Sequence, residues 1–103
     1  MPVVVATLNV KPESVDIVRD ILTRTVAEVH SEPGCQLYAL HETGETFVFI
    51  EQWESPEALQ THATAPAATA MFTAAGEHLA GAPDIKLLQP IPAGDRDKGQ
   101  LRQ

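Results

Sequence analysis

Four side chains that could take part in chemistry fall within one stretch of the chain: Tyr38, Glu51, Trp53 and His62. A histidine titrates near neutral pH and can accept or donate a proton during a reaction. A tyrosine hydroxyl and an indole N–H can each donate a hydrogen bond to a ligand oxygen. Together with a carboxylate, these side chains could converge on one apolar cavity and bind a small ligand there.

Each of the four also has a purely structural interpretation. Trp53 is of a type most often found in the core, where its N–H needs a buried acceptor. Glu51 faces the same way two residues earlier, and a carboxylate in a core is costly unless it is paired. It is therefore either the partner of a buried donor or a member of the site. Tyr38 could be a wall residue, and His62 a partly exposed residue near a helix end.

Asn9 is a further candidate, because it ends a β-branched strand predicted for residues 3–10. It is either a turn former at the strand end or a polar group of the site. No dinucleotide-binding, Walker, Cys-x-x-Cys or His-Glu-x-x-His motif is present, and the spacing of the four histidines is not that of a structural metal site. We therefore do not expect a metal site.

The elements that position these residues are a hairpin and the helix that follows it. Strands are predicted at residues 35–42 and 46–54, joined by a turn that contains Gly44. Ser55 is a good helix N-cap and Pro56 suits a first helical position. Pro66 then breaks the helix, because its ring would clash with the carbonyl four residues earlier.

The flanking segments complete the fold. An apolar stripe at helical spacing predicts a helix over residues 12–30, and an alanine-rich pattern predicts another over 66–79. A last strand is predicted at 84–91. The order strand, helix, strand, strand, helix, strand is that of a ferredoxin-like α+β fold, βαββαβ with an antiparallel sheet. We expect one domain over residues 1–91 and a polar tail over 92–103.

Association is predicted from the strands, which are apolar on both faces although two helices can cover only one. We expect Val4, Leu8, Val48 and Ile50 to lie on the uncovered face, as a patch that soluble monomers avoid. At about 25 cal/mol per Å² of buried apolar surface, covering it would favour association by several kcal/mol. Sheet-to-sheet packing into a homodimer is the simplest arrangement.

Composition limits the remaining partners. The 103 residues include 14 acidic residues against 7 Lys plus Arg, a net charge of −7 that disfavours nucleic acid and anionic membrane surfaces. No apolar run approaches the roughly 20 residues of a membrane span. The single cysteine, Cys35, cannot form an internal disulfide, which suits the cytoplasm. We expect a cytoplasmic protein.

Three short motifs resemble the antibiotic biosynthesis monooxygenase (ABM) family, and most closely its quinol monooxygenase-like branch. They are Pro-Gly-Cys-x-x-Tyr at 33–38, Ile-Glu-Gln-Trp-Glu-Ser at 50–55 and Ala-Leu-x-x-His ending at residue 62. The resemblance implies a dimeric α/β barrel and a cofactor-independent monooxygenase. In that chemistry a quinol or hydroxylated polycyclic aromatic loses a proton, and its anion then reacts with dioxygen.

The resemblance also implies roles for residues. Asn9 and Trp53 would hydrogen-bond the substrate oxygens, and His62 would assist proton removal. The substrate-binding residues would be Tyr38, Glu51, Phe49 and Phe72. Two positions depart from the family pattern: Ala67 stands where a second histidine is frequent, and Gln36 where an apolar residue is usual.

Two alternatives to this enzyme remain open on the sequence. One is a non-catalytic dimeric protein that binds a small apolar ligand, since a scaffold alone does not decide function. The other is a haem-binding or haem-degrading relative, for which His62 and His78 are the candidate ligands.

Overall fold

The computed structural model describes residues 1–102, and the elements within them follow the predicted order. They are β1 (Val3–Asn9), the short 3-10 helix η1 (Pro12–Ser14), α1 (Val15–Val29), β2 (Cys35–Thr43), β3 (Thr46–Trp53), α2 (Pro56–Ala63), α3 (Pro66–Ala75), the 3-10 helix η2 (Gly76–His78) and β4 (Asp84–Leu88).

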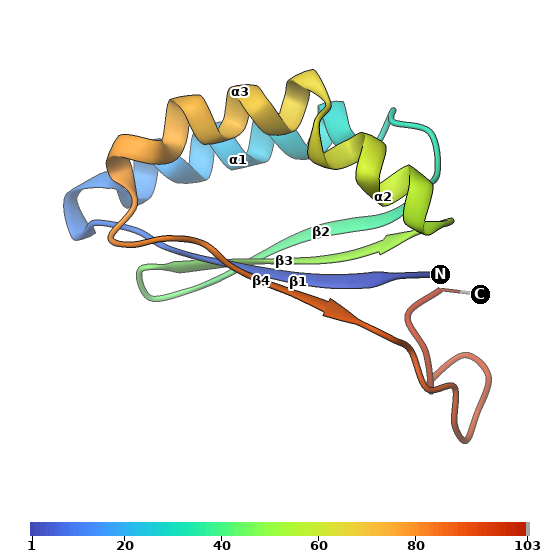
Figure 1. Cartoon of the computed structure of the whole chain (residues 1–103). Helices are drawn as coiled ribbons and strands as arrows, with labels where there is room; N and C mark the ends of the chain where they lie inside the picture. Colours follow the sequence, from blue (N-terminus) through green and yellow to red (C-terminus); the bar gives the residue numbers. More distant parts are fainter. Residues whose placement is uncertain (103) are drawn as a thin grey trace.

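The four strands within residues 1–102 form an antiparallel sheet in the order β2-β3-β1-β4, so the predicted ferredoxin-like α+β fold is confirmed. The helices α1, α2 and α3 all lie over one face of this sheet (Figure 1). We call that side the helix face and the opposite side the outer face. The core lies between the sheet and the helices, and Val18, Leu22 and Val29 of α1 are fully buried in it.

Strand register corrects the expected assignment of two residues to faces. Val4 pairs with Glu51 and Leu8 with Phe47, so Val4 and Leu8 lie on the helix face and belong to the core. Both had been expected on the uncovered face. Because both faces of β1 are apolar, alternation along the strand could not show which face meets the helices. The outer face carries half-buried residues of the inner strands, namely Val5, Thr7, Val48 and Ile50.

Two predicted elements are shorter than expected. α3 ends at Ala75, and the chain tightens into η2 at Gly76 before it leaves the helix layer. β4 ends at Leu88 instead of residue 91, since Pro90 has no N–H with which to continue a ladder. Ile91 is consequently outside the sheet, with 83% of its surface exposed.

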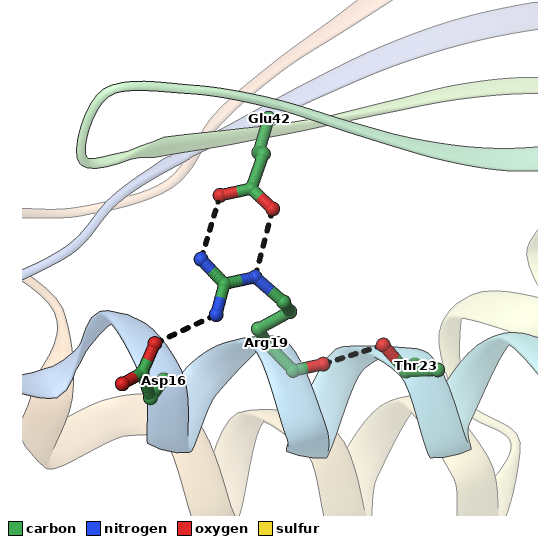
Figure 2. Close-up of polar contacts among 4 residues, drawn as sticks. All are labelled: Asp16, Arg19, Thr23 and Glu42. Carbon is green, nitrogen blue, oxygen red and sulfur yellow. Dashed lines mark hydrogen bonds and ion pairs between the residues drawn. The ribbon is translucent and has the colours of Figure 1, made fainter.

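An ion-pair group on the surface joins α1 to the end of β2 (Figure 2). The guanidinium of Arg19 donates to both carboxylate oxygens of Glu42, at 2.7 and 2.9 Å, and to Asp16 at 2.7 Å. The hydrogen bond from Arg19 is the main cause that lowers the pKa of the Glu42 carboxyl. This contact links α1 to the edge strand at the surface.

The segment after β4 returns to the outer face near the start of β1. The backbone of Arg102 exchanges two hydrogen bonds of 3.1 Å with the Gln52 side chain, which is only 3% exposed. Gln36 accepts a further bond from the same amide at 2.9 Å. The last residue of the predicted 92–103 tail, Gln103, lies outside the described residues. No helix in residues 1–102 is long and apolar enough to cross a membrane.

Candidate active site

A pocket of about 730 Å³ opens between the helix face of the sheet and the helices α2 and α3. Most of its wall is apolar and comes from β1, β4 and α3. Its polar lining residues are Tyr38, Glu51, Gln60, His62 and Gln89. A pocket of this size, apolar with a few polar groups, suits a small and largely apolar ligand.

His62 reaches this pocket from α2. Ser55 caps that helix by accepting a hydrogen bond from the Ala58 N–H at 3.1 Å, and α2 ends at Ala63, before Pro66 begins α3. The His62 residue is 8% exposed. Its ring stacks on Trp53 with 4.4 Å between centroids and an interplanar angle of 28°. Helix position and stacking together fix where the imidazole lies.

Glu32 holds one side of this imidazole. Its Oε1 lies 2.8 Å from Nδ1 of His62. Because an ionised carboxylate can only accept a hydrogen bond, the pairing requires a proton on Nδ1, and in a neutral ring the free lone pair is then on Nε2. Sequence reasoning missed Glu32, which lies between the predicted helix over 12–30 and the predicted strand at 35–42 and was given no role. A carboxylate in a tight turn next to the hairpin was the available signal.

Glu51 faces the other side of the ring. Its Oε1 accepts the Trp53 indole N–H at 3.0 Å and lies 3.9 Å from Nε2 of His62, beyond direct hydrogen-bonding distance. Burial raises the pKa of the Glu51 carboxyl, although the bond from Trp53 and the nearby imidazole act in the opposite direction. Glu51 is thus both the partner of a buried donor and part of the pocket wall.

Tyr38 completes the aromatic wall. Its ring lies 4.7 Å from that of Phe49 and meets His62 edge-on at 5.4 Å. Burial raises the pKa of the Tyr38 phenol well above its usual range, so the hydroxyl stays protonated and available as a donor. Within residues 1–102 this hydroxyl has no hydrogen-bond partner.

The other predicted site residues divide into two groups. Phe49 and Phe72 line the pocket. Asn9 does not, because it lies at the end of β1 opposite Thr46, where it accepts that residue's hydroxyl at 2.8 Å. Trp53 lies at the other end of the strand pair, where its backbone N–H donates to the carbonyl oxygen of Pro2. A strand the length of β1 separates the two by roughly 20 Å, so the structure does not bring Asn9 and Trp53 together.

Trp53 itself is fully buried and lies behind the pocket wall, with its indole N–H committed to Glu51. A hydrogen bond from this N–H to a substrate oxygen would have to replace the bond to Glu51. His78 is also outside the pocket, and its Nδ1 lies 2.9 Å from the Ser14 hydroxyl. Ala67 is buried in the core cluster and does not line the pocket.

The part of the chain that the structure describes has no group of three or more His, Cys, Asp or Glu residues arranged to hold a metal ion. Cys35 is a half-buried free thiol whose pKa is raised by burial, which disfavours the reactive thiolate. The chemical capacity of the site therefore centres on His62, with Glu32, Glu51 and Tyr38 around it.

Comparisons with a family model and with solved structures point to the same protein family. The family model for antibiotic biosynthesis monooxygenase matches residues 1–74. A crystal structure bearing that same description is 29% identical, covers 89% of this chain and 100% of its own, and superposes with a TM-score of 0.84. A Caulobacter crescentus CB15 protein provisionally given that description is 31% identical, with 87% and 89% coverage and a TM-score of 0.82.

The Mycobacterium tuberculosis protein Rv0793 is 26% identical, with 92% coverage of this chain, 100% of its own and a TM-score of 0.84. No curated protein matches the sequence. The similarity thus extends over nearly the whole fold, including the hairpin and helices that build the pocket.

Proposed function

The chain belongs to the antibiotic biosynthesis monooxygenase family, and we propose that it is a cofactor-independent monooxygenase that oxidises a quinol or hydroxylated polyaromatic molecule with dioxygen. One observation carries the proposal. His62 lies on the wall of an apolar pocket with Nδ1 held by Glu32 and Nε2 free of any hydrogen bond to another residue within 1–102. That is the arrangement a general base needs.

Substrate binding in this proposal depends on the shape of the pocket and on its apolar lining. An aromatic ring system fits against Phe49, Phe72 and the apolar side chains of β1 and α3. Glu51 and Glu32 make the surroundings of His62 acidic, which disfavours substrates that carry a carboxylate or phosphate. A neutral polyphenol or quinol therefore suits this pocket better than an anionic substrate.

The first chemical step is proton transfer. Nε2 of His62 takes the proton of a substrate hydroxyl, and the resulting imidazolium lies beside the carboxylate of Glu32. The Tyr38 hydroxyl remains a donor that can stabilise the substrate oxyanion. Burial raises the pKa of the Glu51 carboxyl, so this group takes up a proton more readily than a free glutamate when an anion forms beside it.

The oxygen step then needs no further group from the protein. The substrate anion passes one electron to dioxygen, and the substrate radical and superoxide combine to form a carbon–oxygen bond. Return of the proton from His62 to the peroxide, followed by loss of water, leaves a new carbonyl oxygen on the ring. The protein's contribution is to orient the substrate and keep water out.

We further propose that the chain works as a homodimer packed through the outer face. The half-buried side chains Val5, Val48 and Ile50 form an apolar centre there, and Figure 1 shows all the helices on the opposite side. A second copy of the same face could cover them. Pairing of the two sheets would give the dimeric α/β barrel.

A cytoplasmic location is also proposed. The sole cysteine of the sequence, Cys35, is a free half-buried thiol. A reducing compartment would keep it in that form.

An oxygen electrode tests the reaction. With a menadiol-type or anthrone-type substrate and no added metal or flavin, we expect uptake above the rate without protein. His62→Gln should lower that uptake by about 10²-fold or more, the usual contribution of a general base. His78→Gln is the matched control, because His78 contacts Ser14 outside the pocket.

Two results would contradict the proposal. Undiminished uptake in His62→Gln would remove that residue from the mechanism. Saturable binding of the same aromatics without any oxygen uptake would instead identify a ligand-binding protein, the second candidate, which the size of the pocket also favours.

A further inference from the structure

Glu32 occupies an unusual position relative to the pocket. It comes from the turn between α1 and β2, and it is absent from the pocket wall. Its Oε1 pairs with Nδ1 of His62 at 2.8 Å. Its Oε2 is fully buried and has no hydrogen-bond partner within residues 1–102. The side chain therefore contacts the candidate base without being able to contact a substrate.

We propose that Glu32 is a positioning residue that locks the neutral His62 ring in its Nδ1–H tautomer and keeps Nε2 directed at the pocket. The inference rests on the proposed function insofar as His62 is the base. The two ring nitrogens are not equivalent, and the partner of one decides which of them is free to accept a proton.

The two carboxylates near the ring make unequal contacts, which is why the lock is assigned to Glu32. Glu51 is 3.9 Å from Nε2, and its Oε1 already accepts the indole N–H of Trp53. Glu32 is 2.8 Å from Nδ1. Only the Glu32 contact is short enough to decide where the proton of a neutral ring resides.

The unpartnered oxygen of Glu32 supports a functional role over a purely structural one. A buried polar atom without a partner costs free energy of folding, and such atoms are rare in native structures. A backbone carbonyl could link the turn to α2 without that cost. A full carboxylate adds something different, since its charge stabilises the imidazolium formed when Nε2 takes a proton.

Nitrogen-15 NMR of the histidine rings in the full chain tests the lock directly. At a pH where the ring is neutral, wild-type His62 should show a protonated Nδ1 and an unprotonated Nε2. Glu32→Gln should give a mixture of tautomers, because an amide can either accept from Nδ1–H or donate to a bare Nδ1. Glu28→Gln, an exposed change near the end of α1, should leave the wild-type signature.

Kinetics give the second readout. Glu32→Gln should lower kcat on the order of 10²-fold with little change in KM, because the pocket wall is intact. A wild-type ring protonated on Nε2, or a Glu32→Gln ring that keeps the pure Nδ1–H form, would overturn the proposal. If the lock is present in wild type and lost in Glu32→Gln while no quinol is consumed, the positioning role stands and the proposed oxidation fails.

Discussion

Trp53 donates its indole N–H to Glu51 at 3.0 Å, although the two residues are only two positions apart on the same strand. Both side chains lie on the helix face of β3. The bond satisfies two groups that would otherwise be costly to bury, an indole N–H and a carboxylate. His62 stacks on the indole, so the Trp53–Glu51 pair also supports the ring of the candidate base.

Replacement of Trp53 should therefore act first on stability. Trp53→Phe keeps an aromatic surface under His62 but removes the donor to the buried Glu51, and we expect a loss of roughly 1–3 kcal/mol in the free energy of unfolding. Urea denaturation gives this value. In Trp53→Phe with Glu51→Leu the loss should be smaller than the sum of the single losses. Additive losses would mean that the hydrogen bond contributes nothing.

Glu51 should make stability depend on pH with a defined sign. Its pKa in the folded chain is raised above the ordinary value near 4.5, so the folded state holds the proton more tightly than the unfolded chain does. Through the window above 4.5, unfolding releases protons, and the contribution of Glu51 to stability is lost as the pH rises. Glu51→Gln cannot titrate at this position. Its melting temperature should therefore rise relative to that of wild type as the pH increases from about 4 to about 7. Parallel curves for the two proteins would refute this.

Gly34 should be intolerant of a side chain for two separate reasons. Its φ is +81°, and a Cβ there would lie 2.6 Å from the Cβ of Ala58, one turn before His62 on α2. Gly44 has φ +57° with no atom near such a Cβ, so Gly44→Ala measures the conformational cost alone, about 1–2 kcal/mol. Gly34→Ala should cost at least about 1 kcal/mol more, as overpacking usually does.

A rescue separates the overlap at Gly34 from general damage. Ala58→Gly should recover stability in the Gly34→Ala background, whereas in wild type it should cost about 1 kcal/mol as a helix glycine. Thermal denaturation of wild type, Gly34→Ala, Ala58→Gly and the double variant completes this double-mutant cycle. Equal effects of Ala58→Gly in both backgrounds would show that the turn and α2 are not in contact.

Tyr38 should contribute its hydroxyl to ligands and little to folding. Because this hydroxyl has no hydrogen-bond partner within residues 1–102, Tyr38→Phe should change the free energy of unfolding by less than about 1 kcal/mol. Binding of a hydroxylated aromatic, followed by fluorescence quenching, should weaken clearly, while binding of the matching hydrocarbon should not. Equal weakening for both ligands would mean that the loss of affinity comes from altered packing of the ring at position 38 and not from the lost hydroxyl.

The outer face should govern association. Ile50→Lys puts a charge at the centre of that face, and sedimentation at micromolar concentration should shift from dimer to the 11.1 kDa monomer. Ile17→Lys is the control, since Ile17 is 50% exposed on α1, away from the sheet. A wild-type protein that sediments only as a monomer would contradict the proposed dimer.

The fold was predictable because its local signals agree. Turn residues at 43–45, the Ser55-Pro56 helix start and the Pro66 break each mark a boundary that the structure has within a residue or two. The limits of the longer elements were less clear. Proline at position 90 shortened β4, and Gly76 shortened α3, by effects that depend on how the chain leaves the sheet and the helix layer.

The site was only partly predictable, for physical reasons. Glu51, Trp53 and His62 lie on the consecutive elements β3 and α2. The alternation of side chains along the strand and the N-cap signal of the helix were therefore enough to predict that they lie close together. Glu32 meets His62 only because the α1–β2 turn packs against α2, a contact between segments 30 positions apart. Asn9 lies opposite Thr46 at the far end of β1, a separation from Trp53 that the family motif alone does not give.

The docking of Arg102 on Gln52 has a practical consequence for work with this protein. Met1 also reaches that glutamine, with its sulfur 3.5 Å from the amide nitrogen, so both terminal regions converge at one end of the outer face. A purification tag on either side would begin beside the surface through which two copies are proposed to pair. Sedimentation and crystallisation are therefore best carried out after proteolytic removal of any such extension.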